Sequence, residues 1–223
     1  MDFFILFYSL RCATSLYNLP ILMLLMLSVY LVCLGCGSKA ENILTQHNSV
    51  DGDVTSIEIA APYEYTWKYV PMNELAEIDP VAAQCDSRLD TSKNDYGIKF
   101  TQLTRVRFDD NTLNILDSNT KKAVLNNYYE MYASSLLIPL KSMNNVSNIK
   151  TERKDAIVNG KSGIEIYCSF TDMQKNNDEV FHYFIIKNEK EFWTLITCYS
   201  KNDTKAKNCV DQIYKNVKFK DKK

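Results

Sequence analysis

An apolar run near the start of the chain most strongly limits what this protein can fold into. Residues Ile21–Gly37 read ILMLLMLSVYLVCLGCG and are followed at once by the polar segment Ser38–Asn42. An apolar run of this length before a polar stretch is typical of a cleaved export signal or of a membrane anchor. Under either interpretation the rest of the chain is exported, and it suffices for one domain with a full hydrophobic core.

The end of this run resembles the lipobox of bacterial lipoproteins. In that family a small residue precedes a cysteine whose thiol receives a diacylglycerol before the signal is cut away, and Gly35 and Cys36 occupy these two positions. Cys33 stands where the family prefers leucine. The resemblance implies a signal peptide over residues 1–35 and lipidation of Cys36. It also implies a domain that is held on a bacterial membrane and faces the periplasm or the cell exterior.

Two alternatives stay open because the leader is unusual. Its one positive charge, Arg11, comes after the apolar residues Phe3–Leu10. An export signal ordinarily begins with a positively charged region. The run is therefore also compatible with an uncleaved single-pass anchor or with a plain cleaved signal, and each of these exports the domain.

The charge balance excludes a strongly electrostatic partner. The formal net charge is −1, and the leader holds one acidic and one basic residue, Asp2 and Arg11, so the exported part has the same charge. Nucleic-acid binding would need a basic surface, and basic residues gather only in the tail Lys215–Lys223. We interpret residues 220–223 as a solvated basic tail. We expect no cofactor, since the chain has no glycine-rich phosphate loop.

The sequence predicts a single globular domain over residues 54–219. Residues 36–53 carry almost no apolar side chains, so beyond Cys36 they predict a flexible tether. Residues 82–95, rich in aspartate, predict turns. Apolar periodicity predicts two helices, at 121–137 and 204–216. The first can be capped by Asp117, Ser118 or Asn119 and is stopped by Pro139. The predicted strands are 56–60, 63–70, 96–108, 150–158, 163–170, 180–187 and 192–200. This order predicts an α+β fold, an antiparallel sheet flanked by helices.

The last third of the chain resembles the PsbP/Mog1/DcrB-like superfamily. The resemblance is carried by Ile157–Lys161, which holds an Asn-Gly hairpin signal, and by Tyr183–Lys187, Trp193–Tyr199 and Ile213–Phe219. The superfamily includes photosystem accessory proteins and many small bacterial lipoproteins. The resemblance implies an α/β/α sandwich and carries no catalytic signature.

Four cysteines remain once the leader and Cys36 are set aside: Cys85, Cys168, Cys198 and Cys209. In an exported domain they permit disulfides, or they are buried thiols. We expect no metal site, because the chain has no CxxC pair. Cys198 shares a strand face with Phe192 and Ile196, and Cys209 lies on the apolar stripe of the next helix. If that helix folds back on this face, a disulfide between Cys198 and Cys209 is possible.

An aromatic group is the one candidate binding surface. Tyr63, Tyr65, Trp67 and Tyr69 recur at period two, so they share one face of an extended segment. Such a face could line a recognition groove for a sugar, a peptide or a protein partner. The alternative is that these rings pack the edge of the sheet against a helix.

The polar residues give no catalytic constellation, and we expect no catalytic residue. His182 lies in the middle of a predicted strand, which indicates a surface or sheet-face histidine rather than a general base. Asp90, Ser92 and Asn94 alternate as calcium ligands do. The loop glycine of a calcium site is missing, however, and Thr101 stands where a bidentate glutamate is needed, so a solvated turn is the better interpretation.

Two function classes follow. The first is a non-enzymatic, membrane-anchored binding or accessory module of the bacterial envelope, with the membrane and a protein or small ligand as partners. The alternative is an envelope hydrolase whose site is built from dispersed residues such as Asp86, Asp90 and His182. A pocket that gathers those groups would favour the enzyme, and a shallow aromatic surface would favour the binding module.

Overall fold

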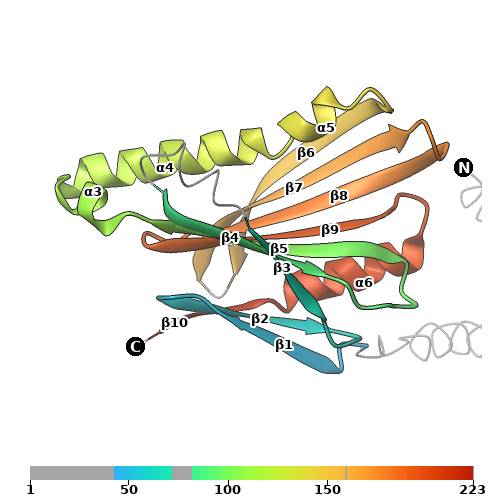
Figure 1. The fold of residues 1–223 in the computed structure, drawn as a ribbon, viewed down its shortest axis with the longest axis horizontal. Coiled ribbons are helices and arrows are strands. Elements are labelled where there is room, and N and C mark those ends of the chain that lie inside the picture. The colour runs from blue at the N-terminus through green and yellow to red at the C-terminus, as the bar shows by residue number, and fades with distance from the viewer. Residues whose placement is uncertain (1–42, 72–81, 159, 223) are drawn as a thin grey trace, which may run out of the picture. The chain divides into compact units, whose positions relative to one another are not determined.

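The structure is a computed structural model that describes residues 43–71, 82–158 and 160–222 (Figure 1). These residues belong to one unit, Ile43–Lys223. The expected signal peptide over residues 1–35 and the lipidated Cys36 lie outside the described residues. In the described ranges, no helix has the length and apolarity needed to cross a membrane.

Antiparallel strands form a main sheet of seven, in the order β3-β4-β5-β9-β8-β7-β6. The β6–β7 hairpin turns at Gly160, whose φ of 77° favours glycine, in keeping with the Asn-Gly signal of the sequence. β5 pairs with β9, so segments from the two halves of the chain meet at the centre of the sheet. The strands are β3 (Trp67–Pro71), β4 (Ala82–Asp90), β5 (Ile98–Phe108), β6 (Val146–Val158), β7 (Lys161–Asp172), β8 (Asn177–Ile186) and β9 (Glu191–Ser200).

Three of the four described helices begin at aspartate caps, as the sequence indicates for the first long one. The Asp117 side chain accepts hydrogen bonds from the backbone N–H groups of Asn119 and Thr120 at the start of α4. Asp203 caps α6 in the same way through the N–H of Ala206. Pro139 lies in the first turn of α5, beyond the end of α4, as predicted. The helices are α3 (Asp110–Asn114), α4 (Ser118–Ser135), α5 (Ile138–Ser142) and α6 (Thr204–Lys215).

Helices lie on both faces of the main sheet, as Figure 1 shows for α4 and α6. Side chains alternate between the two faces of a strand, so β9 contributes to two cores. Phe192 and Ile196 pack with residues of α4 in one core. Trp193 and Leu195 pack with residues of α6 in the other. The α+β class, an antiparallel sheet with helices, is therefore confirmed.

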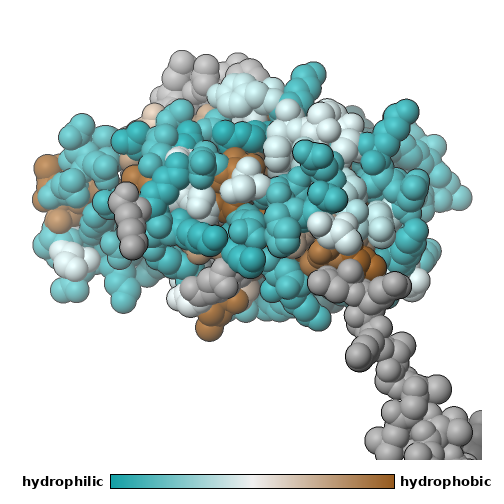
Figure 2. Space-filling model, turned by 90° about the horizontal axis from the view of Figure 1, so that it is seen from below, coloured by the Kyte–Doolittle hydropathy of each residue, from teal (hydrophilic) through white to brown (hydrophobic). Residues whose placement is uncertain are grey.

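A second, three-stranded sheet lies on the α6 side, in the order β1-β2-β10. It consists of β1 (Gln46–Asp51), β2 (Thr55–Ala61) and β10 (Lys218–Asp221). Viewed from this side, the molecular surface is mostly hydrophilic (Figure 2).

This small sheet corrects the expected bounds of the tether and the tail. β1 occupies part of residues 36–53, and β10 extends into residues 220–223. β1 brings Val50, and β10 brings Phe219, into the same core as Ile57 of β2. Each outer strand therefore needs few apolar residues, because most of its other side chains face solvent; the exception is Asn48 of β1, which is buried. The composition of residues 36–53 gave too weak a strand signal for β1, whereas the chain was expected to close with a short extended piece over residues 217–219, where β10 begins.

The predicted turns over residues 82–95 are wrong for the first part of that segment, which is β4. Two of its polar side chains, Asp86 and Ser87, are buried because they have partners on β5. Ser87 lies opposite Thr104, and Asp86 lies opposite Arg105. Buried polar groups need such partners, and the pattern of apolar residues in the sequence does not predict which polar residues pair.

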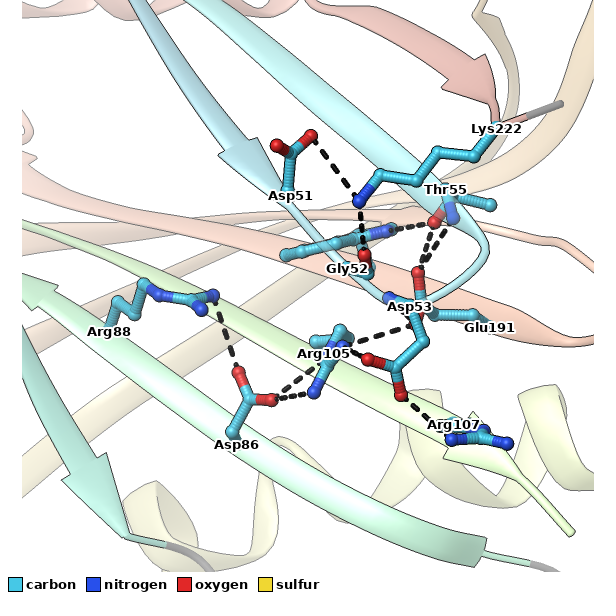
Figure 3. Close-up of polar contacts among 11 residues, drawn as sticks. Asp51, Gly52, Asp53, Thr55, Asp86, Arg88, Arg105, Arg107, Glu191 and Lys222 are labelled. Atoms are coloured by element: carbon cyan, nitrogen blue, oxygen red, sulfur yellow. Dashed lines mark hydrogen bonds and ion pairs between the residues drawn. The ribbon is translucent and has the colours of Figure 1, made fainter.

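Arg105 lies at the centre of a buried charge cluster that joins the two sheets (Figure 3). Its side chain is 6% exposed. It contacts Asp86 of β4 (Nε–Oδ2 2.7 Å), Glu191 of β9 (Nη1–Oε2 3.3 Å) and Asp53 in the β1–β2 turn (Nη1–Oδ1 3.2 Å). Partial burial raises the pKa of the Asp53 carboxyl, but hydrogen bonds and charge attraction from Arg105 and Arg107 outweigh it and lower that pKa below its usual value.

Glu191, the first residue of β9, holds the turn between β1 and β2. Its carboxylate accepts hydrogen bonds from the backbone N–H groups of Asp53 (2.9 Å) and Thr55 (3.1 Å) and from the Thr55 hydroxyl. The Trp193 indole donates to that hydroxyl at 2.7 Å. A Cβ atom on Gly52 would collide with the Glu191 carboxylate, so the close approach requires glycine. These contacts fix the small sheet on the main sheet.

We expect Arg105→Leu to lower the free energy of unfolding by about 3–5 kcal/mol, because it removes the counter-charge of buried Glu191 and leaves buried Asp86 with Arg88 alone, at 3.3 Å. Arg107→Leu is the matched control. Arg107 also binds Asp53, at 2.9 Å, but its side chain is 40% exposed. Its loss should therefore lower the free energy of unfolding by about 1 kcal/mol or less. Urea denaturation followed by circular dichroism measures both, and equal small losses would contradict the central role of Arg105.

Candidate functional site

A cleft of about 910 Å³ lies between the α4–α5 segment and the face of the main sheet below it. Its floor comes from four neighbouring strands, β4, β5, β9 and β8, and its roof from the two helices. The floor residues are Ala82, Cys85, Phe100, Gln102, Thr104, Val106, Ile196, Phe181 and Tyr183. The roof residues are Val124, Asn127, Tyr128, Met131, Tyr132, Ser135, Leu136, Ile138, Pro139, Leu140 and Met143.

The sequence of α4 explains why a cleft forms beside it. Four-residue spacing puts Leu125, Tyr129 and Ala133 on one stripe, and these are the helix residues buried against the sheet. A neighbouring stripe, which begins with Val124 and Tyr128, lines the cleft instead. The apolar arc of α4 is thus wider than the part that the sheet covers.

Large apolar side chains remain exposed at the cleft. Met131 is 65% exposed, Ile138 61% and Met143 48%. A contiguous apolar surface with exposed members of this size is typical of a binding site. The opposite side of the molecule, in Figure 2, is mostly hydrophilic, so this property does not extend over the whole surface.

The described lining of the cleft offers polar groups without charge. Among the described residues, none of those that line it is charged, and its polar side chains are Gln102, Thr104, Asn127 and Ser135. Burial raises the pKa of the Cys85 thiol to about 11, which keeps it protonated at neutral pH. Burial likewise raises the pKa of the Tyr132 and Tyr183 hydroxyls. The cleft therefore offers hydrogen-bonding groups and a large apolar surface.

The predicted aromatic group lies elsewhere, on the other side of the sheet. Tyr65 is 6% exposed, and Tyr63 and Trp67 pack against the α6-side core. The ring centroids of Tyr63 and Tyr65 are 5.2 Å apart, and those of Tyr65 and Trp67 are 5.0 Å apart. Tyr69 is the exposed member, at 54%. Three of the four rings thus pack at the edge of the sheet against the α6-side core, and Tyr69 does not.

The structure does not bring Asp86, Asp90 and His182 together as one site. Asp86 pairs with Arg105, as described above. Asp90 accepts hydrogen bonds from the backbone N–H groups of Thr66 and Ser92, both at 3.0 Å. It therefore stabilises a turn, and no cluster of three or more potential metal ligands occurs within the described ranges.

His182 is a sheet-face histidine, but the expectation that it could be a surface residue is wrong. It is fully buried beneath α6, with its ring centroid 3.9 Å from those of both Tyr167 and Tyr214. Its Nε2 lies 2.6 Å from Oε1 of Glu165. Burial lowers the pKa of His182, and it outweighs the hydrogen bond and the charge of Glu165, which raise that pKa. Burial raises the pKa of Glu165, but hydrogen bonds from His182 and Lys154 outweigh it and lower that pKa to about 2.

The possible disulfide between Cys198 and Cys209 is not formed, and both residues are buried free thiols. The predicted strand face of Cys198, shared with Phe192 and Ile196, is the α4 side of the sheet. Helix α6 packs on the opposite face and carries Cys209 into the other core. The expectation placed each cysteine on its own element correctly, but it chose the wrong face of the sheet for α6.

No known protein family matches the sequence, and no curated protein does. Among solved structures, the chain is similar to LpqN, described as involved in cell envelope biogenesis of Mycobacterium tuberculosis. The sequence identity is 12% and the TM-score is 0.39, and the match covers 78% of this chain and 91% of LpqN. It is also similar to PA94 of Pseudomonas aeruginosa, a protein of unknown function, at 10% identity and a TM-score of 0.34, covering 77% and 95%. Likenesses at this level carry no argument about function.

We expect His182→Ala to lower the free energy of unfolding by about 2–4 kcal/mol, because it removes a buried ring and leaves the Glu165 carboxylate short of a partner. His47→Ala is the matched control. His47 also binds a glutamate, Glu58, at 2.9 Å, but its side chain is 61% exposed. Its loss should change the free energy of unfolding by less than about 1 kcal/mol. Similar values for the two variants would contradict the buried role of His182.

The difference in the free energy of unfolding between the native protein and His182→Ala should also shrink as pH falls from 7.5 to 5. The pKa of His182 in the folded state lies below the ordinary value of 6.5. The unfolded chain therefore binds a proton near pH 6.5 before the folded protein does, and the native protein loses stability as pH falls through this range. The variant lacks this loss. Urea denaturation at the two pH values measures the difference, and a cost that grows toward pH 5 would contradict it.

Proposed function

We propose that this chain is a non-enzymatic binding module of the bacterial envelope, tethered to a membrane, that holds an apolar ligand in the cleft beneath α4 and α5. The observation that carries the proposal is the cleft itself, with about 910 Å³ lined by apolar and aromatic side chains. Ligand sites typically have volumes of roughly 300–1,000 Å³ and a mainly apolar lining with a few polar groups. The cleft has both properties.

The membrane tether rests on the sequence. The apolar run Ile21–Gly37 and its end at Gly35-Cys36 support lipidation of Cys36. Because the folded unit begins at Ile43, seven residues of backbone can place the domain at most about 25 Å from the lipid. A module held this close to a bilayer has ready access to apolar molecules. Helices on opposite faces of the sheet also suit a PsbP/Mog1-like sandwich, a superfamily that includes small bacterial lipoproteins.

The alternative, an envelope hydrolase, has less support. Asp86, Asp90 and His182 each serve a separate set of structural contacts, with Arg105, a turn and Glu165 respectively. Hydrolysis needs a nucleophile and a base that share one site. The thiol that lines the cleft, Cys85, has a raised pKa and lacks the activation that such a nucleophile needs.

Substitution of Cys36 tests the tether. Cys36→Ala should abolish labelling of the protein by a fatty acid in bacterial cells and should block removal of the leader, because the thiol is the attachment point. Acyl labelling and the mass of the purified protein measure the two effects. A Cys36→Ala protein that is still labelled and still processed would contradict lipidation at this residue.

Substitution of Ser135 tests the cleft. Ser135 lines it, and Ser135→Trp should fill it and weaken binding of the neutral apolar dye N-phenyl-1-naphthylamine at least about tenfold. Ser134→Trp is the control. Ser134 is the neighbouring exposed residue on α4, outside the cleft, and its hydroxyl also donates to a helix carbonyl, at 2.8 Å in both cases.

Dye fluorescence measures binding to the native protein and to both variants, and circular dichroism checks that each is folded. The native protein and Ser134→Trp should bind the dye equally. Equal binding to Ser135→Trp, or no binding to the native protein, would refute the cleft as the ligand site.

A further inference from the structure

Building on the proposed function, we infer that the cleft takes an uncharged lipid, a single acyl chain with a neutral polar group such as a glycerol ester or a hydroxyl, which is bound at Gln102. Three properties of the described residues carry this inference: the length of the cleft, the absence of charge in its lining and a hydrogen-bonding seam in its floor.

The cleft is elongated. Its floor follows β5 from Phe100 to Val106, with every second residue lining it. At a rise of about 3.3 Å per residue, this stretch is about 20 Å long. A cleft of this length suits an extended acyl chain better than a compact ring system. The side chains of Met131 and Met143 are flexible and polarizable, so they can adapt to such a chain.

Aromatic rings give the cleft apolar walls along its length. Phe100 and Phe181 in the floor have ring centroids 5.6 Å apart. Tyr128 and Tyr132 in the roof are stacked, with centroids 6.5 Å apart. Apolar contact with these rings favours a hydrocarbon chain, because burial of each methylene contributes about 0.8 kcal/mol.

The lining disfavours a charged headgroup. None of the described lining residues is Lys, Arg, His, Asp or Glu. A carboxylate or phosphate drawn into the cleft would lose its hydration without gaining a counter-charge, and that loss costs far more than the burial of a neutral ester or hydroxyl. The ligand group inside the cleft is therefore neutral.

A polar seam in the floor can receive that neutral group. The Gln102 amide nitrogen donates to the Ser87 hydroxyl at 2.8 Å, and Ser87 shares a hydrogen bond of 3.1 Å with Thr104. Ser87 is fully buried and Thr104 is 3% exposed, so these hydrogen-bonded side chains are held in fixed positions within the sheet. These bonds orient the Gln102 amide through its nitrogen. Its carbonyl oxygen is an acceptor for a ligand hydroxyl.

Displacement of N-phenyl-1-naphthylamine tests the inference. The protein is used from residue 36 onward with Cys36→Ser, which contains the whole unit Ile43–Lys223. Monopalmitoylglycerol should displace the dye at a concentration about tenfold lower than hexadecanoate at pH 8, a preference that one hydrogen bond together with one desolvated charge can supply. Gln102→Leu should remove most of this preference. Gln84→Leu, the same change at an exposed position of β4 outside the cleft, should keep it.

The outcomes separate this inference from the proposed function. If hexadecanoate competes as well as monopalmitoylglycerol while Ser135→Trp still blocks the dye, the cleft binds apolar ligands but the neutral-lipid inference is wrong. The selectivity of the native protein decides this even if Gln102→Leu fails to fold. If the native protein binds no dye, or forms a dimer that Ser135→Trp dissociates, both the proposed function and this inference are overturned.

Discussion

The burial of β9 on both faces is the constraint on which the rest of the structure depends. All but the last residue of this central strand are buried. Because successive side chains of a strand point in opposite directions, both faces of the main sheet need a cover. Phe192 and Trp193, neighbours in sequence, belong to different cores. Glu191, which precedes them, holds the small sheet in place on one of these faces.

The two covers differ in extent, and the cleft follows from that difference. On one face, α6 and the three-stranded sheet pack together, and the contacts of Arg105 and Glu191 with the β1–β2 turn fix the small sheet there. On the other face, the principal cover among the described residues is α4. A helix is about 10 Å wide and strands lie about 4.8 Å apart, so one helix covers roughly two of the seven strands. The apolar floor beside α4 is therefore left as a cleft, which α5 only partly roofs.

The sequence predicted the elements whose own pattern is strong and missed those that depend on partners. The long helices, the hairpin at Gly160 and the central strands follow from periodicity and caps. β1 was missed because it contributes few apolar residues, and β4 because buried Asp86 has its counter-charge on another strand, β5. The cleft was missed because its residues have the composition of a core. One signal for it was available: the apolar arc of α4, which includes Tyr128 and Met131, is wider than one packing face requires.

Methyl NMR of methionine tests most directly the central claim that this cleft is the ligand site. Met131 and Met143 line the cleft, whereas Met173 is also exposed, at 52%, but lies outside it. A protein labelled at the methionine methyl groups is titrated with monopalmitoylglycerol. The account predicts that the Met131 and Met143 signals shift and saturate together while the Met173 signal stays in place. Shifts confined to Met173, or equal shifts of all three signals, would contradict it.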